Sequence, residues 1–292
     1  MAGGALTLSN VERECLEYHT SSTIASQLHI TEFITLQANP QSTRVLANEY
    51  LAGRLAGTIG LSVPGPAIIH VDAETIRQYN ISFQLAETQL APTAGLHFGS
   101  RFIVDEEVHD WLPSSWIGNI KNVKEFAGIL AFDKWTRNAD GRQVVFHKRR
   151  SQRKYTAAFI DFGYCFNAAE WSFPDSPLRG AYTRQEVYAR VESWSDFEPW
   201  LSRIERRSKA DLLTKADLLS IAWQIPGEWY GERQELDCLV QALFERRKVV
   251  RHLIDDFRKS YRNPFPHWKL GPVASTSSDH IGDLAAMISL PG

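Results

Sequence analysis

Residues 130–143 read LAFDKWTRNADGRQ, and residues 159–163 read FIDFG. The first stretch runs from an apolar segment into a polar loop that contains Asp140, and the second is an apolar strand candidate that ends at Asp161. Between them, residues 144–147 and 155–160 are rich in β-branched and aromatic side chains and are separated by a charged turn, which predicts a β-hairpin. The sequence therefore predicts two loop aspartates, one on each side of a hairpin.

Two loop aspartates in this order suit the transfer of a phosphoryl group to a hydroxyl. A carboxylate within hydrogen-bond reach of the hydroxyl accepts its proton, and a second carboxylate at a strand end holds magnesium ions on the nucleotide phosphates. The alternative is that each aspartate is only a turn or cap residue, which is the usual place of an isolated loop aspartate. Their placement on either side of one hairpin favours a site.

The composition is that of an ordinary globular protein. The chain has 292 residues, of which 43% are apolar and 23% charged, so it is long enough for one large domain or two lobes. The three cysteines are widely spaced and form no CxxC pair, which speaks against a disulfide framework or a zinc site. The N-terminal residues lack a basic start, and no apolar run reaches about 18 residues. We therefore expect a cytoplasmic protein that does not contact a membrane.

Charge and aromatic residues divide the chain into two parts. Residues 1–120 hold five Arg, no Lys and twelve Asp or Glu, for a formal charge of −7, whereas the rest of the chain carries +5. All nine tryptophans lie from Trp111 onward. Two compositions in one chain favour two lobes. We predict an N-terminal lobe at 1–105, a C-terminal lobe at 106–263 and a linker-like tail at 264–292.

The predicted elements differ between the two lobes. In the first lobe, short strands are predicted at 32–37, 67–71 and 96–104, with one helix at 45–60. In the second lobe, helical spacing is found at 123–132, 194–204, 208–224 and 236–257, and a short helix is expected within the tail at 279–288. The sequence thus predicts an α+β protein with a small mixed lobe and a larger, mainly helical one.

Several short motifs, taken in order, resemble the HipA-like kinase family. They are Asn48-Glu49, residues 60–64 (GLSVP), residues 95–100 (GLHFGS), residues 131–146 and residues 160–167. The similarity extends over roughly residues 32–268, and the ordered set is more specific than any one motif. The resemblance implies a two-lobed protein-kinase-like fold, with ATP and Mg²⁺ between the lobes and a Ser or Thr hydroxyl of a protein as the acceptor.

The resemblance also implies roles for individual residues. Asp140 matches the catalytic base, and Asn138 is expected to fix the catalytic loop or to assist at the metal. Asp161 matches the metal-binding aspartate, and Gln143 is the nearest amide for a second metal contact. Glu49 matches the helix glutamate that pairs with a lysine on the nucleotide phosphates.

The chain departs from the family pattern in three places. Thr35 stands where the family has the phosphate-pairing lysine, and no lysine precedes Lys121. Residues 18–27, where a glycine-rich flap is expected, contain no glycine. Five residues after Asp140 the chain has Val145 in place of an asparagine. Each departure weakens the inference that the chain is catalytically active.

An arginine could take the place of the missing lysine, since a guanidinium binds phosphate through two hydrogen bonds. The candidates are Arg44, Arg54 and Arg101. Of these, we assign Arg44 to the nucleotide site, together with Glu49 and Gln143. For any one of them, the more common arrangement is an arginine that faces solvent.

These observations leave three hypotheses. The first is an ATP- and magnesium-dependent kinase that acts on a protein, and the second is a pseudokinase that binds a partner protein without turnover. The third keeps the fold but takes a small molecule as acceptor, because fold does not fix function. We expect no direct binding to nucleic acid, because the basic turn at 148–154 lacks interleaved aromatic residues and the whole chain is slightly acidic.

Overall fold

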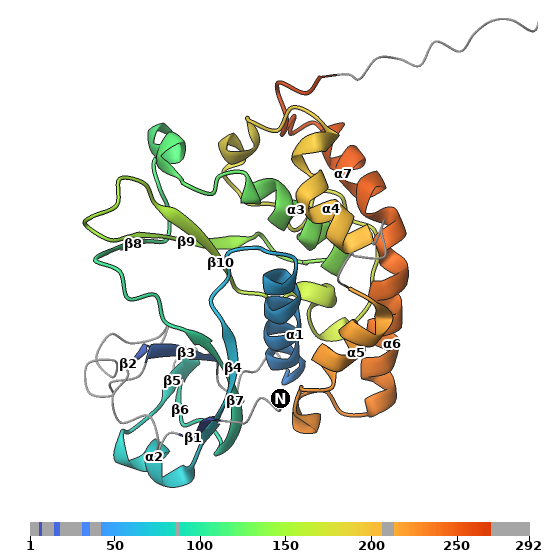
Figure 1. Cartoon of the computed structure of the whole chain (residues 1–292). Helices are drawn as coiled ribbons and strands as arrows, with labels where there is room; N and C mark the ends of the chain where they lie inside the picture. The colour runs from blue at the N-terminus through green and yellow to red at the C-terminus, as the bar shows by residue number, and fades with distance from the viewer. Residues whose placement is uncertain are drawn as a thin grey trace, which may run out of the picture.

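A computed structural model describes residues 42–85, 88–205 and 213–269, together with the backbone of three strands nearer the N-terminus. Strands dominate the N-terminal part of the described chain and helices the C-terminal part, with a second, smaller sheet between them (Figure 1). The predicted α+β class with two lobes is therefore confirmed.

The N-terminal lobe is built on a five-stranded sheet with the order β1-β4-β7-β3-β2. Its strands are β1 (Leu6–Thr7), β2 (Cys15–Glu17), β3 (Thr31–Thr35), β4 (Pro66–Val71) and β7 (Gly95–Arg101). β7 lies between β3 and β4 and is antiparallel to both. Helix α2 (Ala73–Gln78) and the hairpin of β5 (Phe83–Leu85) and β6 (Thr88–Leu90) are inserted between β4 and β7. The predicted strands at 32–37, 67–71 and 96–104 are present with slightly different ends.

A three-stranded sheet with the order β10-β9-β8 follows the N-terminal lobe. It consists of β8 (Glu107–His109), β9 (Gln143–Lys148) and β10 (Thr156–Ile160). β9 and β10 form the predicted antiparallel hairpin, and their register pairs Gln143 with Ile160. This register places the start of β9 beside the end of β10, where Asp161 follows. The chain passes from the first sheet to the second between Arg101 and Glu107.

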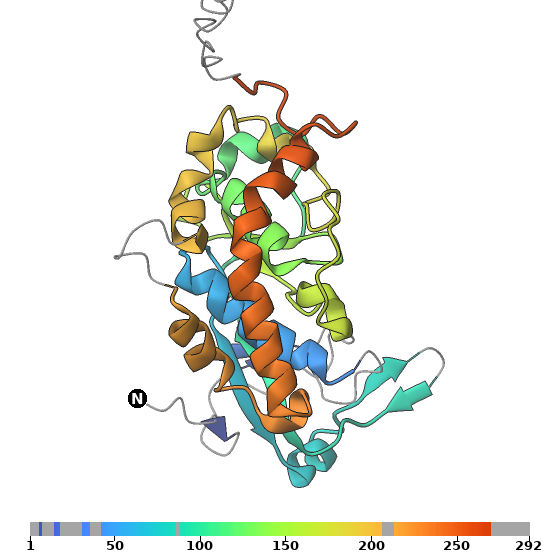
Figure 2. The same ribbon diagram turned by 90° about the vertical axis from the view of Figure 1, so that its right-hand side faces the viewer.

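Helices make up most of the C-terminal lobe (Figures 1 and 2). The α-helices are α3 (Glu125–Thr136), α4 (Glu198–Glu205), α5 (Lys215–Ala222), α6 (Arg233–Arg246) and α7 (Val250–Arg258). Short 3₁₀ helices connect them: η2 (Ser114–Asn119), η3 (Cys165–Glu170), η4 (Gln185–Tyr188), η5 (Trp194–Asp196), η6 (Gly227–Trp229) and η7 (Arg247–Val249). The helix predicted at 236–257 is thus α6 and α7 with η7 between them, and η5 and α4 occupy the piece predicted at 194–204.

The helix predicted at 208–224 is represented by α5, which is shorter than expected. Thr214 is its N-cap: the Thr214 hydroxyl accepts from the amide of Asp217, and the Asp217 carboxylate accepts from the amide of Thr214. This reciprocal capping box fixes the start of α5 at Lys215. Residues 208–212, the first part of the prediction, lie outside the described residues.

Helix α1 (Arg44–Thr58) connects the two lobes. It packs against β4 and β7 of the sheet on one side and against η3, α5 and η6 on the other (Figure 1). Eleven of its 15 residues are buried, including the polar pair Asn48 and Glu49. A helix that is covered all round must satisfy its polar side chains with partners inside the protein. The partners of Asn48 and Glu49 prove to be part of the site described below.

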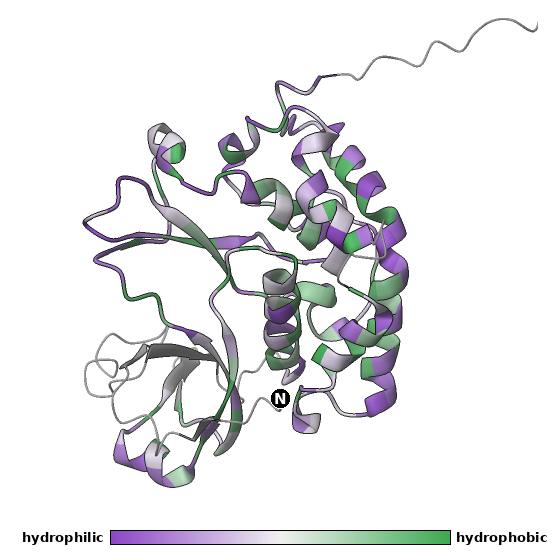
Figure 3. Cartoon of the chain, in the orientation of Figure 1, coloured by the Kyte–Doolittle hydropathy of each residue, from purple (hydrophilic) through white to green (hydrophobic). Residues whose placement is uncertain are grey.

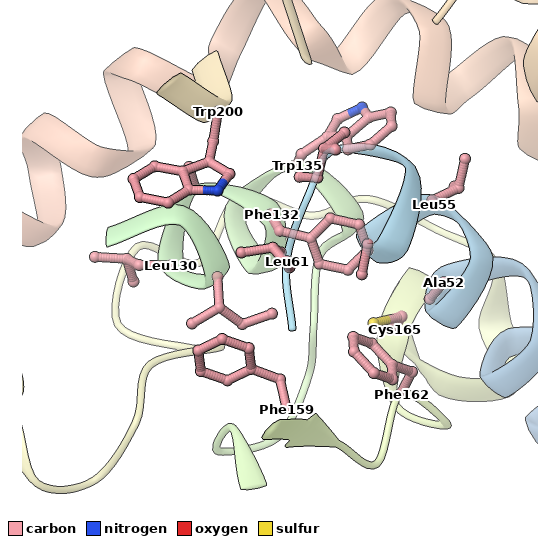
Figure 4. Packing of buried hydrophobic residues seen from close by; sticks show 14 of the residues in the cluster. Ala52, Leu55, Leu61, Leu130, Phe132, Trp135, Phe159, Phe162, Cys165 and Trp200 are labelled. Atoms are coloured by element: carbon pink, nitrogen blue, oxygen red, sulfur yellow. The ribbon is translucent and has the colours of Figure 1, made fainter. Parts of the chain in front are cut away.

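One apolar core runs through both lobes. Figure 4 shows side chains of α1, α3 and the chain after β10 meeting in it, with Phe132 of α3 at 5.9 Å from Phe162 between ring centroids. Trp200 of α4 packs on Gly128 of α3, where a side chain larger than hydrogen would meet the indole. The outer helices have mixed polar and apolar surfaces, as Figure 3 shows for α6 and α7. The core thus joins α1 firmly to the helical lobe.

Packed chain continues beyond the predicted start of the tail at residue 264. Phe265 is buried, and its ring lies 6.1 Å from that of Phe257 and 5.7 Å from that of Trp268. The helix predicted at 279–288 lies outside the described residues. Within the part of the chain that is described, no helix is both long and apolar enough to cross a membrane.

Candidate active site

A cavity of about 650 Å³ opens between the two sheets. Its lining includes Val45, Glu49 and Gly53 of α1, Phe98 and residues 100–105 of β7 and the connection, Gln143 and Val145 of β9, and residues 159–162 of β10 and the loop after it. The half-buried residues Val145 and Ile160 give it apolar walls, while Glu49, Gln143 and Asp161 bring polar groups to its lining. Apolar cavities of this size with a few converging polar groups are typical small-molecule sites.

Asp161 and Gln143 meet at the lining of this cavity. The side-chain amide of Gln143 donates a hydrogen bond to Oδ2 of Asp161. Asp161 has φ of +60°, a left-handed conformation that residues other than Gly adopt infrequently. Such backbone conformations concentrate at functional sites, where surrounding contacts hold them. The structure therefore brings together the two residues that the sequence assigns to the metal.

Helix α1 holds the loop that follows Asp161. The carboxylate of Glu49 accepts hydrogen bonds from the amides of Phe162 and Gly163, both at 2.9 Å. The side-chain amide of Asn48 donates to the carbonyls of Gly163 at 2.8 Å, Cys165 at 3.1 Å and Ala168 at 2.8 Å. Asn48 also accepts from the indole of Trp171 at 2.8 Å. Two adjacent side chains of one helix thus fix the backbone next to Asp161.

The environment of Glu49 changes its acidity. Burial, followed by the nearby carboxylate of Asp161, raises the pKa of Glu49 to about 8, although its two amide donors and Arg142 act in the opposite direction. Both oxygens of Glu49 are engaged by backbone amides. The sequence expectation for Glu49 was a role on the nucleotide side; the structure places it in the cavity lining and gives it the amides after Asp161 as partners.

The loop between α3 and β9 carries Asp140. The amide of Asp140 donates to Oδ1 of Asn138 at 3.0 Å, and Nδ2 of Asn138 donates to Asp133 at 3.1 Å. Asn138 is buried and holds the loop through both ends of its amide, which is one of the two roles expected for it. The side chain of Asp140 is exposed, and its Oδ1 accepts from the amide of Gly141 at 2.7 Å. Asp140 lies outside the cavity lining and faces solvent.

A buried ion pair joins this loop to the end of β10. Arg142 and Asp133 are both fully buried, and the guanidinium binds the carboxylate through Nε at 3.1 Å and Nη2 at 2.5 Å. Nη1 of Arg142 donates to the carbonyls of Ile160 at 2.6 Å and of Asp161 at 2.8 Å. Although burial alone would lower it, the Asp133 carboxylate raises the pKa of Arg142, which stays charged.

A second link runs between the two loops themselves. The amide of Ala139 donates to the carbonyl of Tyr164 at 2.9 Å, and the amide of Asn167 donates to the carbonyl of Arg137 at 3.1 Å. Together with Arg142, these bonds place the loops of Asp140 and Asp161 side by side. The structure thus brings together the two acidic segments that the sequence pairs across the hairpin.

The arginines proposed for the nucleotide phosphates have different surroundings. Arg44 pairs with Glu235 at 2.5 Å, donates to the carbonyl of Ala169 at 3.1 Å and lies over the ring of Trp171. It is not part of the cavity lining, and neither is Arg54. Arg101 does line the cavity, and it is the one cationic residue among the described residues of the lining. Thr35 pairs with Phe98 across β3 and β7, so its backbone lies next to a residue of the cavity.

Sequence reasoning gave no role to Asn48, Asp133 or Arg142. The available signal was a charged or polar residue inside an apolar helical run: Asn48 and Glu49 interrupt the apolar spacing of α1, and Asp133 follows Phe132 in α3. Such residues are rarely buried unless they are paired. Their partners lie too far away along the chain to be identified from spacing.

Comparison with known proteins gives the family. Solved structures that match include the Golgi casein kinase (TM-score 0.42, 10% identity, 74% of this chain and 62% of that chain covered). A Helicobacter pylori proinflammatory kinase, CtkA, also matches (TM-score 0.40, 11% identity, 77% of this chain and 84% of that chain). The match thus spans less than two thirds of the Golgi casein kinase chain. No curated protein matches the chain. The model of the HipA-like kinase family matches residues 33–262, and the chain belongs to this family.

Proposed function

We propose that this protein is an ATP- and magnesium-dependent kinase that transfers the γ-phosphate to a Ser or Thr hydroxyl of a protein. The observation that carries the proposal is the contact of Asp161 with Gln143 at the lining of the interlobe cavity, next to the loop that carries Asp140. Nucleotide and protein substrate are the partners that this function requires.

The cavity suits a nucleoside triphosphate. The half-buried residues Val145 and Ile160 offer apolar surface to a purine ring. The backbone groups of Ile103 and Val104 lie in the lining and make no hydrogen bond within the described residues, so they can pair with the polar edge of adenine. This part of the chain is the connection between the lobes, where both sheets border the cavity.

Asp161 and Gln143 fit a magnesium ion. Mg²⁺ takes oxygen ligands and is commonly held by one or two protein side chains together with the substrate phosphates. Asp161 offers its carboxylate, and rotation of the Gln143 amide turns Oε1 toward the same point. When bound, the ion neutralises charge on the phosphates as the phosphoryl group leaves.

Asp140 is the proposed base. The acceptor oxygen forms a bond to the γ-phosphorus as the bond from that phosphorus to the bridging oxygen of ADP breaks, and the hydroxyl proton passes to the Asp140 carboxylate. The exposed side chain of Asp140 is open to an acceptor, and Asn138 and Arg142 hold its loop in place.

Transfer of radiolabelled γ-phosphate by the purified protein tests the proposal. We expect Asp140→Asn to reduce transfer by at least about 100-fold, whereas Asp110→Asn, a matched change at another exposed aspartate, leaves it unchanged. Transfer that survives in Asp140→Asn would remove the base from the proposal. In Asp161→Ala, nucleotide affinity measured by calorimetry should no longer respond to magnesium.

The pseudokinase remains the second candidate function. It is favoured by Thr35 at the position of the family lysine and by Arg101 as the one cation of the described cavity lining. It predicts nucleotide binding without transfer to any acceptor, together with a stable partner protein recovered by pull-down. A small-molecule acceptor is distinguished by mass spectrometry of the phosphorylated product.

A further inference from the structure

The 173–179 segment lies against the catalytic loop on the side of the C-terminal helices. The amide of Gly180 donates to the carbonyl of Asp140 at 3.1 Å, and Nη1 of Arg179 donates to the carbonyl of Ala139 at 3.3 Å. The position of the 173–179 segment and that of the loop bearing the proposed base are therefore coupled.

Cationic side chains hold nearly every residue of this segment. The bonds are Arg246 to the carbonyl of Phe173 at 3.2 Å and to the carboxylate of Asp175 at 3.1 Å, Arg137 to the carbonyl of Pro174 at 2.8 Å, Lys134 to the carbonyls of Pro177 at 2.7 Å and of Arg179, and Arg262 to the carbonyl of Leu178 at 3.4 Å. Together with Arg179 itself, four arginines surround the segment, and with them Lys134, whose pKa is lowered by burial to about 7. We name them the cationic cluster.

The cationic cluster has too few negative charges. Among the described residues, the carboxylate that bonds to one of its members is that of Asp175, and its side chain is 60% exposed. Burial, followed by Arg246 and Arg179, lowers the pKa of Arg137. Asp133 lies near Lys134, but its carboxylate is bound on both oxygens by Arg142. The cluster is thus a concentration of like charges that an anion would relieve.

Ser176 occupies the middle of the segment. It is half-buried, and its carbonyl accepts from the amide of Arg179 at 3.2 Å, which closes a turn. The hydroxyl of Ser176 has no hydrogen-bond partner within the described residues, whereas that of Ser172 accepts from Asn167 at 2.9 Å. Ser176 therefore carries an uncommitted hydroxyl between residues that are all bonded to cations.

We propose that Ser176 is a phosphorylation site and that the cationic cluster binds its phosphate. The inference rests on the proposed function only where it takes this protein itself as the kinase that phosphorylates Ser176. The hydroxyl oxygen of Ser176 bonds to the γ-phosphorus of ATP, the bond to ADP breaks, and the proton passes to the base of the phosphorylating kinase, which is Asp140 in self-phosphorylation. A phosphoserine carries about −1.5 to −2 charges and can form about 1–3 charge-assisted hydrogen bonds with arginines.

The phosphate site is tested without any kinase activity. Phosphoserine is incorporated at position 176 during synthesis in the Asp140→Asn background, and the melting temperature is compared with that of the same variant with unmodified Ser176. We expect a rise of at least about 3 °C. Phosphoserine at position 172 is the matched control and should give no rise. An unchanged or lower melting temperature with phosphoserine at 176 overturns the proposal.

Two variants link the rise to the arginines. Arg179→Gln and Arg262→Gln each remove one exposed guanidinium, so folding should survive, and each should reduce the rise by about half. A rise that is undiminished in the double variant also overturns the proposal, since the phosphate would then act elsewhere.

A second measurement decides the source. The wild type is incubated with ATP and magnesium, and its phosphorylated residues are mapped by mass spectrometry. Phosphate on Ser176, absent in Asp140→Asn, supports self-phosphorylation, whereas phosphate on Ser172 or Thr183 alone contradicts it. If the protein labels neither itself nor any acceptor, the proposed kinase function fails, while the melting temperatures still decide whether the cluster binds a phosphate at Ser176.

Discussion

The side chains that define this site at the residue scale are polar groups placed inside the core. Glu49 and Asn48 form hydrogen bonds with the backbone after Asp161. Arg142 donates to the carboxylate of Asp133 and to the carbonyl of Asp161, just after β10. A buried polar group without partners costs about 1–3 kcal/mol. These side chains therefore force the loops into the one arrangement in which all are paired.

Glu49 predicts a pH dependence of stability. The pKa of Glu49 is about 8 in the folded protein and 4.5 is its ordinary value, so between these limits the folded state binds a proton that the unfolded state releases. The contribution of Glu49 to the free energy of unfolding is thus fully present below about pH 4.5 and is lost as the pH rises toward 8, by at most about 1.4 kcal/mol per pH unit. Urea unfolding at pH 5, 6.5 and 8 should show this decline.

The decline should be smaller in Glu49→Gln, which cannot ionise. Glu74→Gln, at an exposed position of α2, is the control and should keep the wild-type slope. Equal slopes in wild type and Glu49→Gln would show that Glu49 does not titrate in this range.

The buried pair of Arg142 and Asp133 predicts a large loss of stability when one partner is removed. Arg142→Ala leaves a buried carboxylate without its cation, and we expect a loss of about 3–5 kcal/mol in the free energy of unfolding. Lys248→Ala, which breaks an exposed pair with Glu245, should cost less than about 1 kcal/mol. Denaturant unfolding of the two variants compares them directly, and similar losses would contradict the structural role of Arg142.

Helix α1 determines the site at the scale of elements, because it lies close against the loop after Asp161. Gly163 allows this approach: a Cβ there would lie 2.7 Å from Cγ1 of Val45 and 3.2 Å from Oε1 of Glu49. Contacts of this kind cannot form without a shift of the helix or the loop. The glycine two residues after Asp161 thus has a packing reason in this chain.

Gly163→Ala should therefore push α1 away from the loop. We expect a loss of about 1–3 kcal/mol in stability, as for other overpacked sites, and weaker nucleotide binding. Gly227→Ala, where a Cβ meets open space, is the matched control. Adding Val45→Ala should restore part of the loss, and its failure to do so would mean that the clash with Val45 is not the cause. Thermal unfolding and calorimetry measure the two effects.

At the scale of the whole molecule, the described parts of both lobes share one apolar core and line one cavity, so a nucleotide bound in that cavity should stabilise the folded protein. At a concentration of 100 times its Kd, ADP with magnesium should add about 2.7 kcal/mol to the free energy of unfolding. Val145→Phe fills the cavity wall and should abolish most of this gain while leaving the unliganded protein folded. An undiminished gain in Val145→Phe would place the nucleotide elsewhere.

Much of this architecture could be predicted from the sequence because its signals are local. The three- and four-residue spacing in α1 and the β-branched runs of β9 and β10 predicted those elements, and the hairpin predicted that Asp140 and Asp161 lie on either side of it. The six-residue α2 and the three-residue β8 are too short for periodicity to be recognised.

The partners of the site residues could not be predicted in the same way. Arg44 meets Glu235, 191 residues away, and Glu49 meets the amides of residues more than 100 positions later. Such contacts depend on how the lobes pack, which no local pattern records. The assignment of Arg44 to the nucleotide therefore rested on charge alone, and tertiary packing gave that charge other neighbours.

The position of α1 has a mechanical consequence. One face of the helix packs on the sheet, and the side chains of Asn48 and Glu49 bind the chain after Asp161. A tilt of the sheet would therefore move α1 and that chain together. Narrowing of the crevice and alignment of the Asp161 carboxylate then become a single movement, and neither can be adjusted without the other.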